Sequence, residues 1–401
     1  MLNWKLKTRG LQPIGLDIGH SSIKMIQLAG NGEQVTVHAA DKICIDGDTN
    51  GDAEERRRIV ISAIKQMLAR SNFHGKSVVS CLPNDKLKIT SLRLAEAEMG
   101  EIEQFLRKEV SHRFGLSSDR DLINFLVAGS TRQGDEIRKE LILFAADDET
   151  IKGHIDMLEE ARLRPVAIDA VPCALFRSFE RLLRRQEDKE RTVVFVDLGS
   201  RFTTVVFGCG GEISFVKQMQ LGGEKFNHEI AAKLGISIKE AETLRENLRR
   251  ERSVSGTCLE NGRNENHIDA LTRQAVVDAI GLVAEELARE ISLCFRYYTV
   301  TFRGKRVERA VFSGGEAHEG ILLDVLRRQL AVEIEVAQPL KGFEMTNVKF
   351  DACKRGSLCD WAVAVGLSLK GWKTGSSLEG EEHECAGHIE DRRGHDDYER
   401  N

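Results

Sequence analysis

Two short segments of this 401-residue chain repeat one pattern, and their aspartates lie 180 positions apart (197 − 17). The first is Ile14-Gly-Leu-Asp-Ile-Gly-His-Ser-Ser-Ile-Lys24, and the second is Val194-Phe-Val-Asp-Leu-Gly-Ser-Arg-Phe-Thr-Thr204. Each starts as an apolar strand and continues with Asp-x-Gly and hydroxyl residues. One copy alone is ordinary turn chemistry, because Asp and Gly both stabilise tight bends. Two copies, one opening each half of the chain, predict two related α/β halves that face each other across a phosphate site.

The first copy has every group that a phosphate and its magnesium ion need. Asp17 ends a buried strand, where a carboxylate can orient magnesium-bound water. Gly19 lets a phosphate approach the backbone N–H groups of the turn. Lys24 lies seven residues after Asp17, on the expected second strand of a hairpin, where its ammonium group can reach the same phosphates. The predicted residues of this copy are Asp17, Gly19, Ser21, Ser22 and Lys24.

The second copy is the opposing half of the predicted clamp. It contains hydroxyl residues but no lysine. Its side chains are Asp197, Gly199, Ser200, Thr203 and Thr204, of which we assign Asp197, Gly199 and Thr203 to the nucleotide. Asp17 and Asp197 are the predicted magnesium ligands.

A third segment completes the pattern. Val311–Glu316 is a short apolar run followed by paired glycines, and a helix-like stretch comes next. Glycines at a strand-to-helix turn admit a flat ring or a phosphate close to the backbone. We therefore expect Gly314 and Gly315 to face the adenosine.

With these segments in place, the chain resembles the actin, sugar-kinase and heat-shock ATPase superfamily, and within it the PilM family, with a more distant similarity to FtsA. The resemblance extends over most of residues 11 to 370. The matching motifs, in chain order, are Gly15 to Lys24, Leu221-Gly-Gly-Glu224, Lys239-Glu-Ala-Glu242, Ser313-Gly-Gly315 and Ala362-Val-Ala-Val-Gly-Leu367. The chain departs from the family pattern at His20, where a serine is usual, at Arg201 and Phe202, where small residues are usual, and at Arg245, where a lysine is usual.

The resemblance implies an actin-like, ribonuclease H-like duplicated ATPase fold with two large domains around a nucleotide cleft. It implies ATP and Mg²⁺ as cofactors, with Glu242 as a further nucleotide partner, and hydrolysis that is slow or absent. It also implies that a groove between the first domain and an inserted subdomain binds the cytoplasmic N-terminal peptide of PilN, a single-span membrane protein. The expected role is a cytoplasmic scaffold of pilus assembly that reaches the inner membrane through this partner, with self-association possible.

The predicted domain borders follow the pattern of apolar segments. Residues 1–75 and 163–190 form the first actin-like domain, and 76–162 form the inserted small subdomain. Residues 191–370 form the second actin-like domain, with an inserted lobe at about 226–301. The polar, acidic stretch 371–401 is predicted to be disordered.

Charge and composition exclude several classes of protein. The tail after residue 370 holds nine acidic and four basic residues, which leaves 54 acidic and 54 basic residues in the rest of the chain. The composition of this neutral body shows no concentrated basic face for nucleic acid, and the basic stretch 177–191 is expected to be the solvated face of a helix. No run approaches the roughly 18 apolar residues of a membrane span. The nine cysteines include no Cys-x-x-Cys pair and do not suggest a secreted disulfide framework.

Two other functions fit the same fold class. A small-molecule kinase would need a base that activates a substrate hydroxyl, and Asp169 is the candidate. An FtsA-like filament-forming protein would need a C-terminal amphipathic anchor, which the acidic tail does not provide. A type II secretion component with a related cytoplasmic fold is harder to separate from pilus assembly.

Overall fold

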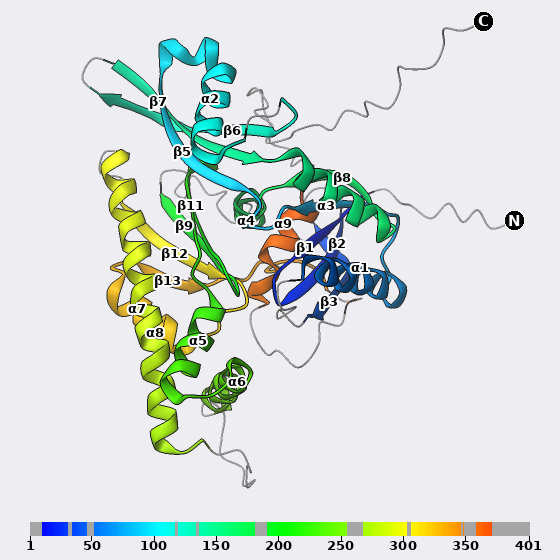
Figure 1. The fold of residues 1–401 in the computed structure, drawn as a ribbon, viewed down its shortest axis with the longest axis vertical. Coiled ribbons are helices and arrows are strands. Elements are labelled where there is room, and N and C mark those ends of the chain that lie inside the picture. The colour runs from blue at the N-terminus through cyan, green and yellow to red at the C-terminus, as the bar shows by residue number, and fades with distance from the viewer. Residues whose placement is uncertain are drawn as a thin grey trace, which may run out of the picture.

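The computed structural model in Figure 1 describes residues 10–30, 34–45, 52–116, 119–133, 136–180, 191–254, 268–302, 306–345, 348 and 358–370. The predicted disordered tail 371–401 lies outside the described residues. Within the described ranges, no helix combines the length and the apolar character needed to cross a membrane.

The first large domain is built on a five-stranded sheet of order β3-β2-β1-β4-β8. Its strands are β1 (Leu11–Ile18), β2 (Ser22–Gly30), β3 (Val35–Cys44), β4 (Ser77–Cys81) and β8 (Arg164–Asp169). The first three form an antiparallel meander, while β4 and β8 run parallel to β1. Helices α1 (Ala53–Arg70) and α3 (Asp148–Glu160) pack together beside this sheet, and their apolar faces join its core.

The second large domain repeats this topology. Its sheet has the order β11-β10-β9-β12-β13, again with an antiparallel meander followed by two parallel strands. The strands are β9 (Thr192–Leu198), β10 (Thr203–Cys209), β11 (Glu212–Met219), β12 (Val307–Ser313) and β13 (Glu333–Val336). Because the two sheets match strand for strand, the predicted duplicated α/β fold is confirmed.

A three-stranded antiparallel sheet forms the inserted subdomain. Its order is β5-β7-β6, made of β5 (Lys88–Ala95), β6 (Leu122–Gln133) and β7 (Glu136–Ala146), with the 3-10 turn η1 (Glu96–Glu101) leading into α2 (Ile102–Phe114). Leu106 and Val110 of α2 pack on one face of this sheet. Ile142 and Phe144 belong to the core of the second large domain.

The border of the inserted subdomain differs from the expected 76–162. β4 was expected to open the subdomain, but it pairs with β1 because its apolar residues extend the first sheet. α3 was expected to close it, but it packs on β8 and α1. The three-stranded unit therefore corresponds to residues 88–146.

Helices fill the lobe inserted in the second domain. They are α5 (Gly223–Leu234), α6 (Ile238–Val254) and the 32-residue α7 (Ala270–Thr301), and α8 (Gly320–Gln329) packs beside α7. Figure 1 shows α7 running along the edge of the molecule that is remote from the first sheet.

Two helices connect the large domains. Helix α4 (Val171–Glu180) follows β8, and the 3-10 turn η3 (Cys359–Trp361) leads into α9 (Ala362–Ser368), which returns to the first sheet. The two helices are in close contact between the domains (Figure 1). A Cβ atom at Gly366 would lie 1.7 Å from the Ala174 carbonyl oxygen, and one at Gly15 would lie 2.1 Å from that of Ala364. Only glycine fits at either contact.

Candidate functional site

The two predicted phosphate turns have the same backbone geometry. In the first, the N–H of Gly19 donates to the carbonyl of Ser22 at 3.0 Å, and in the second Gly199 donates to Phe202 at 3.0 Å. A Cβ atom at Gly19 or Gly199 would lie 2.8 or 2.9 Å from the same carbonyl oxygens. The tightness of each turn therefore requires the glycine that follows Asp-x.

Strand register aligns the side chains of each hairpin. Asp17 lies opposite Lys24 in the first hairpin, and Asp197 lies opposite Thr204 in the second. Directly opposed residues project from the same face of a sheet. Lys24 Nζ donates to the Asp17 carboxylate at 3.1 Å. Thr204 thus occupies, in the second half, the position of the lysine in the first.

The acidic groups of the two halves are electrostatically coupled. Burial raises the pKa of Asp197 to about 6, and the nearby charge of Asp17 adds to the increase. Burial alone would lower the pKa of Lys24, but the carboxylates of Asp17, Asp360 and Asp197 outweigh it and raise the pKa. The structure therefore brings Asp17, Lys24 and Asp197 into one electrostatically interacting group.

Asp360 is part of this group and has no counterpart in the sequence prediction. It lies in η3 and pairs with Lys42 of β3 at 2.6 Å. Its charge raises the pKa of both Lys24 and Asp197. No sequence motif surrounds Asp360. Its place beside Lys24 and Asp197 is seen only in the folded structure, where η3 brings this part of the chain to the site.

The two adjacent threonines of β10 have opposite roles. The Thr203 hydroxyl donates to the carbonyl of Leu221 at 2.6 Å, so it is used inside the second domain. The Thr204 hydroxyl is fully buried and has no hydrogen-bond partner among the described residues. Successive strand residues point to opposite faces. The free hydroxyl is therefore the one on the face of Asp197.

The third predicted segment lies beside the second turn. Ser313 of β12 donates to the Asp197 carboxylate at 3.2 Å. Gly314 has a φ of +94°, and a Cβ atom there would lie 2.3 Å from the Leu198 carbonyl oxygen. Gly315 is exposed and has no heavy atom within 4 Å of its Cβ position. Open space at Gly315 is compatible with a bound ring.

Side chains also connect the two turns directly. His20 of the first turn donates from Nε2 to Glu224 of α5 at 2.7 Å. Arg201 of the second turn donates to both oxygens of the same carboxylate, at 2.9 and 3.0 Å. Arg56 holds the carbonyls of Gly19 and His20 at 2.9 and 3.1 Å. We call His20, Glu224 and Arg201 the turn bridge.

The turn bridge arises from two of the departures noted in the sequence. Burial raises the pKa of Glu224, but the bonds from His20 and Arg201 outweigh it, so the pKa lies below its usual value. A serine at position 20 would be too short to make the same contact. The contact of His20 could not be predicted from sequence because its partner lies 204 residues away (224 − 20).

Helix α6 carries Glu242, the further nucleotide partner implied by the resemblance, and Arg245, which departs from the family's lysine. Arg245 is buried and pairs with Glu316 and Glu319 at 2.5 and 3.1 Å, while its guanidinium lies over the Phe226 ring. Arg249 pairs with the same two acids. Glu242 is exposed. The buried face of α6 therefore joins a charge cluster beside Gly315, and Glu242 is on its exposed side.

The candidate base of a kinase is also engaged in structural contacts. The Asp169 carboxylate is buried, pairs with Arg177 at 2.8 Å and Lys370 at 3.5 Å, and accepts from the N–H of Ala170. Arg177 also donates to the Gly366 carbonyl. These contacts tie the end of β8 to α4 and α9.

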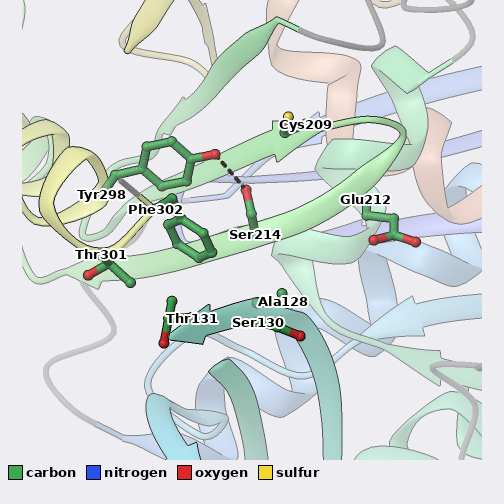
Figure 2. Close-up of a pocket in the computed structure, with 10 residues that line it drawn as sticks. Ala128, Ser130, Thr131, Cys209, Glu212, Ser214, Tyr298, Thr301 and Phe302 are labelled. Atoms are coloured by element: carbon green, nitrogen blue, oxygen red, sulfur yellow. Dashed lines mark hydrogen bonds between the residues drawn. The ribbon is translucent and has the colours of Figure 1, made fainter. Parts of the chain in front are cut away.

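A separate cavity lies where the inserted subdomain meets the second domain. It has a volume of about 250 Å³, and its lining comes from β6, the β10–β11 hairpin and the end of α7. Figure 2 shows Ser130 and Thr131 on one side and Ser214, Tyr298 and Phe302 on the other. Ser214 donates to the Tyr298 hydroxyl at 3.3 Å. This cavity lies between the subdomain and the second domain, whereas the groove expected from the sequence lies between the subdomain and the first domain.

Comparisons with known proteins agree with this architecture. The solved structure of a PilM-PilN type IV pilus biogenesis complex matches with a TM-score of 0.71 and 21% sequence identity, covering 90% of this chain and 99% of that one. The ethanolamine utilization protein EutJ from Carboxydothermus hydrogenoformans matches with a TM-score of 0.52 and 13% identity, covering 90% of each chain. A family model described as type IV pilus assembly protein PilM matches residues 15–260, which is more than half of the chain. The chain therefore belongs to the PilM family.

Proposed function

We propose that this protein is an ATP-binding, actin-like scaffold of type IV pilus assembly. The observation that carries the proposal is the pair of matched turns, which set Asp17, Lys24 and Asp197 within electrostatic reach of one another. Phosphate oxygens are recognised by an ammonium group and by free backbone N–H groups at a glycine turn. Lys24 supplies the ammonium group, and the glycine turn is closed by the bond from the Gly19 N–H to the Ser22 carbonyl.

ATP would bind between the two halves. Asp17, Gly19, Ser21, Ser22 and Lys24 would hold it from the first turn. Asp197 and Gly199 would hold it from the second, and Gly314 and Gly315 would face the adenosine. Thr203 would support the second turn through its bond to Leu221, and the exposed Glu242 would take part only at the rim.

The residues present fit a magnesium ion. Carboxylate and hydroxyl oxygens are the ligands that Mg²⁺ prefers, and Asp17 and Asp197 would hold the ion or its waters. The unpartnered Thr204 hydroxyl adds an oxygen on the same face. Among the described residues no group of three or more acidic, His or Cys side chains forms a metal site by itself. The remaining ligands would therefore be phosphate oxygens and water, and the ion would neutralise phosphate charge.

The nucleotide site is tested by replacing Asp17. We expect Asp17→Ala to abolish magnesium-dependent ATP binding measured by titration calorimetry. The control is Asp156→Ala, which removes an exposed carboxylate of α3. Unchanged magnesium-dependent binding in Asp17→Ala, with both variants folded by circular dichroism, would refute the site.

The partner in this proposal is the cytoplasmic N-terminal peptide of a PilN-like single-span membrane protein. The support is family membership and the similarity to a structure solved as a PilM-PilN complex. Through this partner the protein would act in the cytoplasm at the inner membrane. Peptide binding would shift the relative populations of domain orientations by its difference in affinity for them.

Crosslinking the protein in its native membranes, with ATP and magnesium present, would test the partner and locate its binding surface. We expect the cytoplasmic end of a single-span protein to crosslink to residues of 76–162 that face the first domain. Crosslinks to Ser130 or Thr131 would instead place the peptide at the cavity of Figure 2. Recovery of no membrane protein would count against the scaffold.

We expect ATP hydrolysis to be slow or absent. The small-molecule kinase has less support, because the Asp169 carboxylate is already held by Arg177 and Lys370 and is not free to accept a substrate proton. Turnover of a sugar or small acid with ATP would revive that alternative.

A further inference from the structure

The outer face of α7 carries a row of exposed apolar side chains. Five of the nine large apolar residues that are exposed in the described part of the chain lie on this one helix. They are Leu271, Leu282, Leu293, Tyr297 and Val300, with exposed fractions from 41% to 84%. Large apolar side chains that gather on one element of a soluble protein indicate an interaction surface.

The row is straight and runs almost the whole length of the helix. Leu271, Leu282 and Leu293 are spaced by eleven residues, which is close to three full helical turns. Val300 follows seven residues after Leu293, or about two turns. The buried residues of α7, such as Ile280 and Leu287, point to the opposite side. The row is therefore a second, outward-facing apolar stripe.

Charged residues lie beside this apolar stripe on the exposed surface of α7. Glu285 and Glu286 are followed by Arg289, the half-buried Glu290 and Arg296. Glu285, Glu286, Arg289 and Arg296 are exposed, and none of these four has an ion-pair partner among the residues that the structure describes. When the helix is reversed on itself so that Leu282 lies opposite Leu293, Glu286 lies opposite Arg289, and Glu285 lies opposite Glu290 (575 − 285).

We propose that α7 pairs antiparallel with α7 of a second copy of this chain, forming a two-fold symmetric dimer. In the register that aligns the leucines, Leu282 faces Leu293 of the partner copy. Ala275 then faces Val300, and Glu286 faces Arg289. Symmetry makes each of these contacts twice. The paired segment from Ala275 to Val300 is about 39 Å long.

Charge selects this arrangement over the parallel one. A parallel pair would also stack the leucines, but it would place Glu286 against Glu286 and Arg289 against Arg289. Like charges at facing positions are destabilising. The antiparallel pair converts both repulsions into ion pairs.

A two-fold contact of this kind is closed. Each copy uses its stripe once, so the contact makes dimers and does not propagate a filament. The stripe lies in the second domain, along the edge remote from the first sheet (Figure 1). The dimer is therefore independent of the nucleotide site, and either proposal can fail without the other.

Charge exchange tests the dimer and its direction. By sedimentation equilibrium we expect the full chain to show twice its monomer mass of 44.9 kDa. Arg289→Glu would weaken the dimer about tenfold or more, because it replaces two ion pairs by two repulsions. The double variant Glu286→Arg with Arg289→Glu would restore the affinity. A wild-type monomer at all soluble concentrations, or a double variant no tighter than the single one, would overturn the proposal.

Cysteine pairs test the register. Leu282→Cys combined with Leu293→Cys would give a disulfide-linked dimer under mild oxidation, while neither single variant would link beyond the wild-type level. The wild-type chain is the control for its native cysteines. Linking by Leu282→Cys alone would indicate a parallel pair and contradict the proposal.

Discussion

At the scale of single residues, the position of one hydroxyl distinguishes a binding group from a structural one. Thr203 and Thr204 are neighbours of the same chemistry. One bonds to the Leu221 carbonyl, while the other is buried without a partner on the face of Asp197. A buried polar group without a hydrogen bond destabilises a protein, so its retention suggests a ligand. The pair therefore offers its own matched control.

Thr204→Val is expected to keep the nucleotide-free protein as stable as the wild type, or more stable by up to about 1 kcal/mol. We expect it to weaken magnesium-dependent ATP binding about tenfold, since a hydrogen bond to a charged group is lost. Thr203→Val should instead lower the free energy of unfolding by about 1–2 kcal/mol and leave magnesium-dependent ATP binding close to that of the wild type. Chemical denaturation and calorimetry measure both quantities. Equal ATP affinity in Thr204→Val and the wild type would contradict the assignment.

Asp197 gives a prediction about pH. Its pKa is raised to about 6, so the folded protein keeps this proton over a pH range in which the unfolded chain has already lost it. The free energy of unfolding therefore falls as the pH rises from about 4 to about 6, and the deficit persists above that range.

Asp197→Asn should remove this deficit. We expect the variant to exceed the wild type by about 1–3 kcal/mol at pH 7.5 without nucleotide, with the difference disappearing near pH 4. Urea denaturation at both pH values measures it, and Asp156→Asn serves as an exposed control. A gain that is independent of pH would show that ionisation of Asp197 is not its cause.

At the scale of helices and strands, the contact of α4 with α9 depends on a residue without a side chain. Gly366→Ala would place a methyl group 1.7 Å from the Ala174 carbonyl oxygen. The helices would have to move apart, and we expect a loss of about 2–3 kcal/mol. Gly281→Ala in α7 is the control, because no atom lies within 4 Å of its Cβ position. That change should stabilise the protein by about 0.5–1 kcal/mol. Thermal denaturation that ranks the two variants the other way would contradict this packing.

The parts predictable from sequence were those with a local cause. The hairpin turns were predictable because Asp-x-Gly fixes their shape within a few residues, and the repeat showed that the sheet is duplicated. The border of the inserted subdomain was not predictable from sequence, because the apolar composition of β4 is compatible with pairing in either sheet. Thr204 appeared in the motif, but the choice between it and Thr203 depends on strand register. Asp360 and Glu224 approach the site only through contacts distant in sequence.

At the scale of the whole molecule, the turn bridge holds the two halves together beside the proposed phosphate site. Glu224→Gln should weaken its contacts with His20 and Arg201. We expect faster hydrogen exchange of the Gly19 and Gly199 amides, while unfolding free energy changes by less than about 1 kcal/mol.

The control for the turn bridge is Glu246→Gln, which alters an ion pair with Arg250 inside a single helix. Exchange measured by mass spectrometry should respond at the two turns only in Glu224→Gln. Equal exchange in the two variants would mean that the turn bridge does not restrict the halves.

The return of α9 to the first sheet has a consequence for synthesis on the ribosome. The apolar faces of β2 and β3 are covered by residues between Leu340 and Leu369, and Ser368 accepts a bond from the Leu28 N–H. The last of these residues is made 324 positions after β3 and Ile45 have been completed (369 − 45). At a synthesis rate of about 5–20 residues per second, roughly 16–65 s pass between completion of β3 and synthesis of the last residue that covers this sheet. The domain that is made first is therefore the one that finishes folding last.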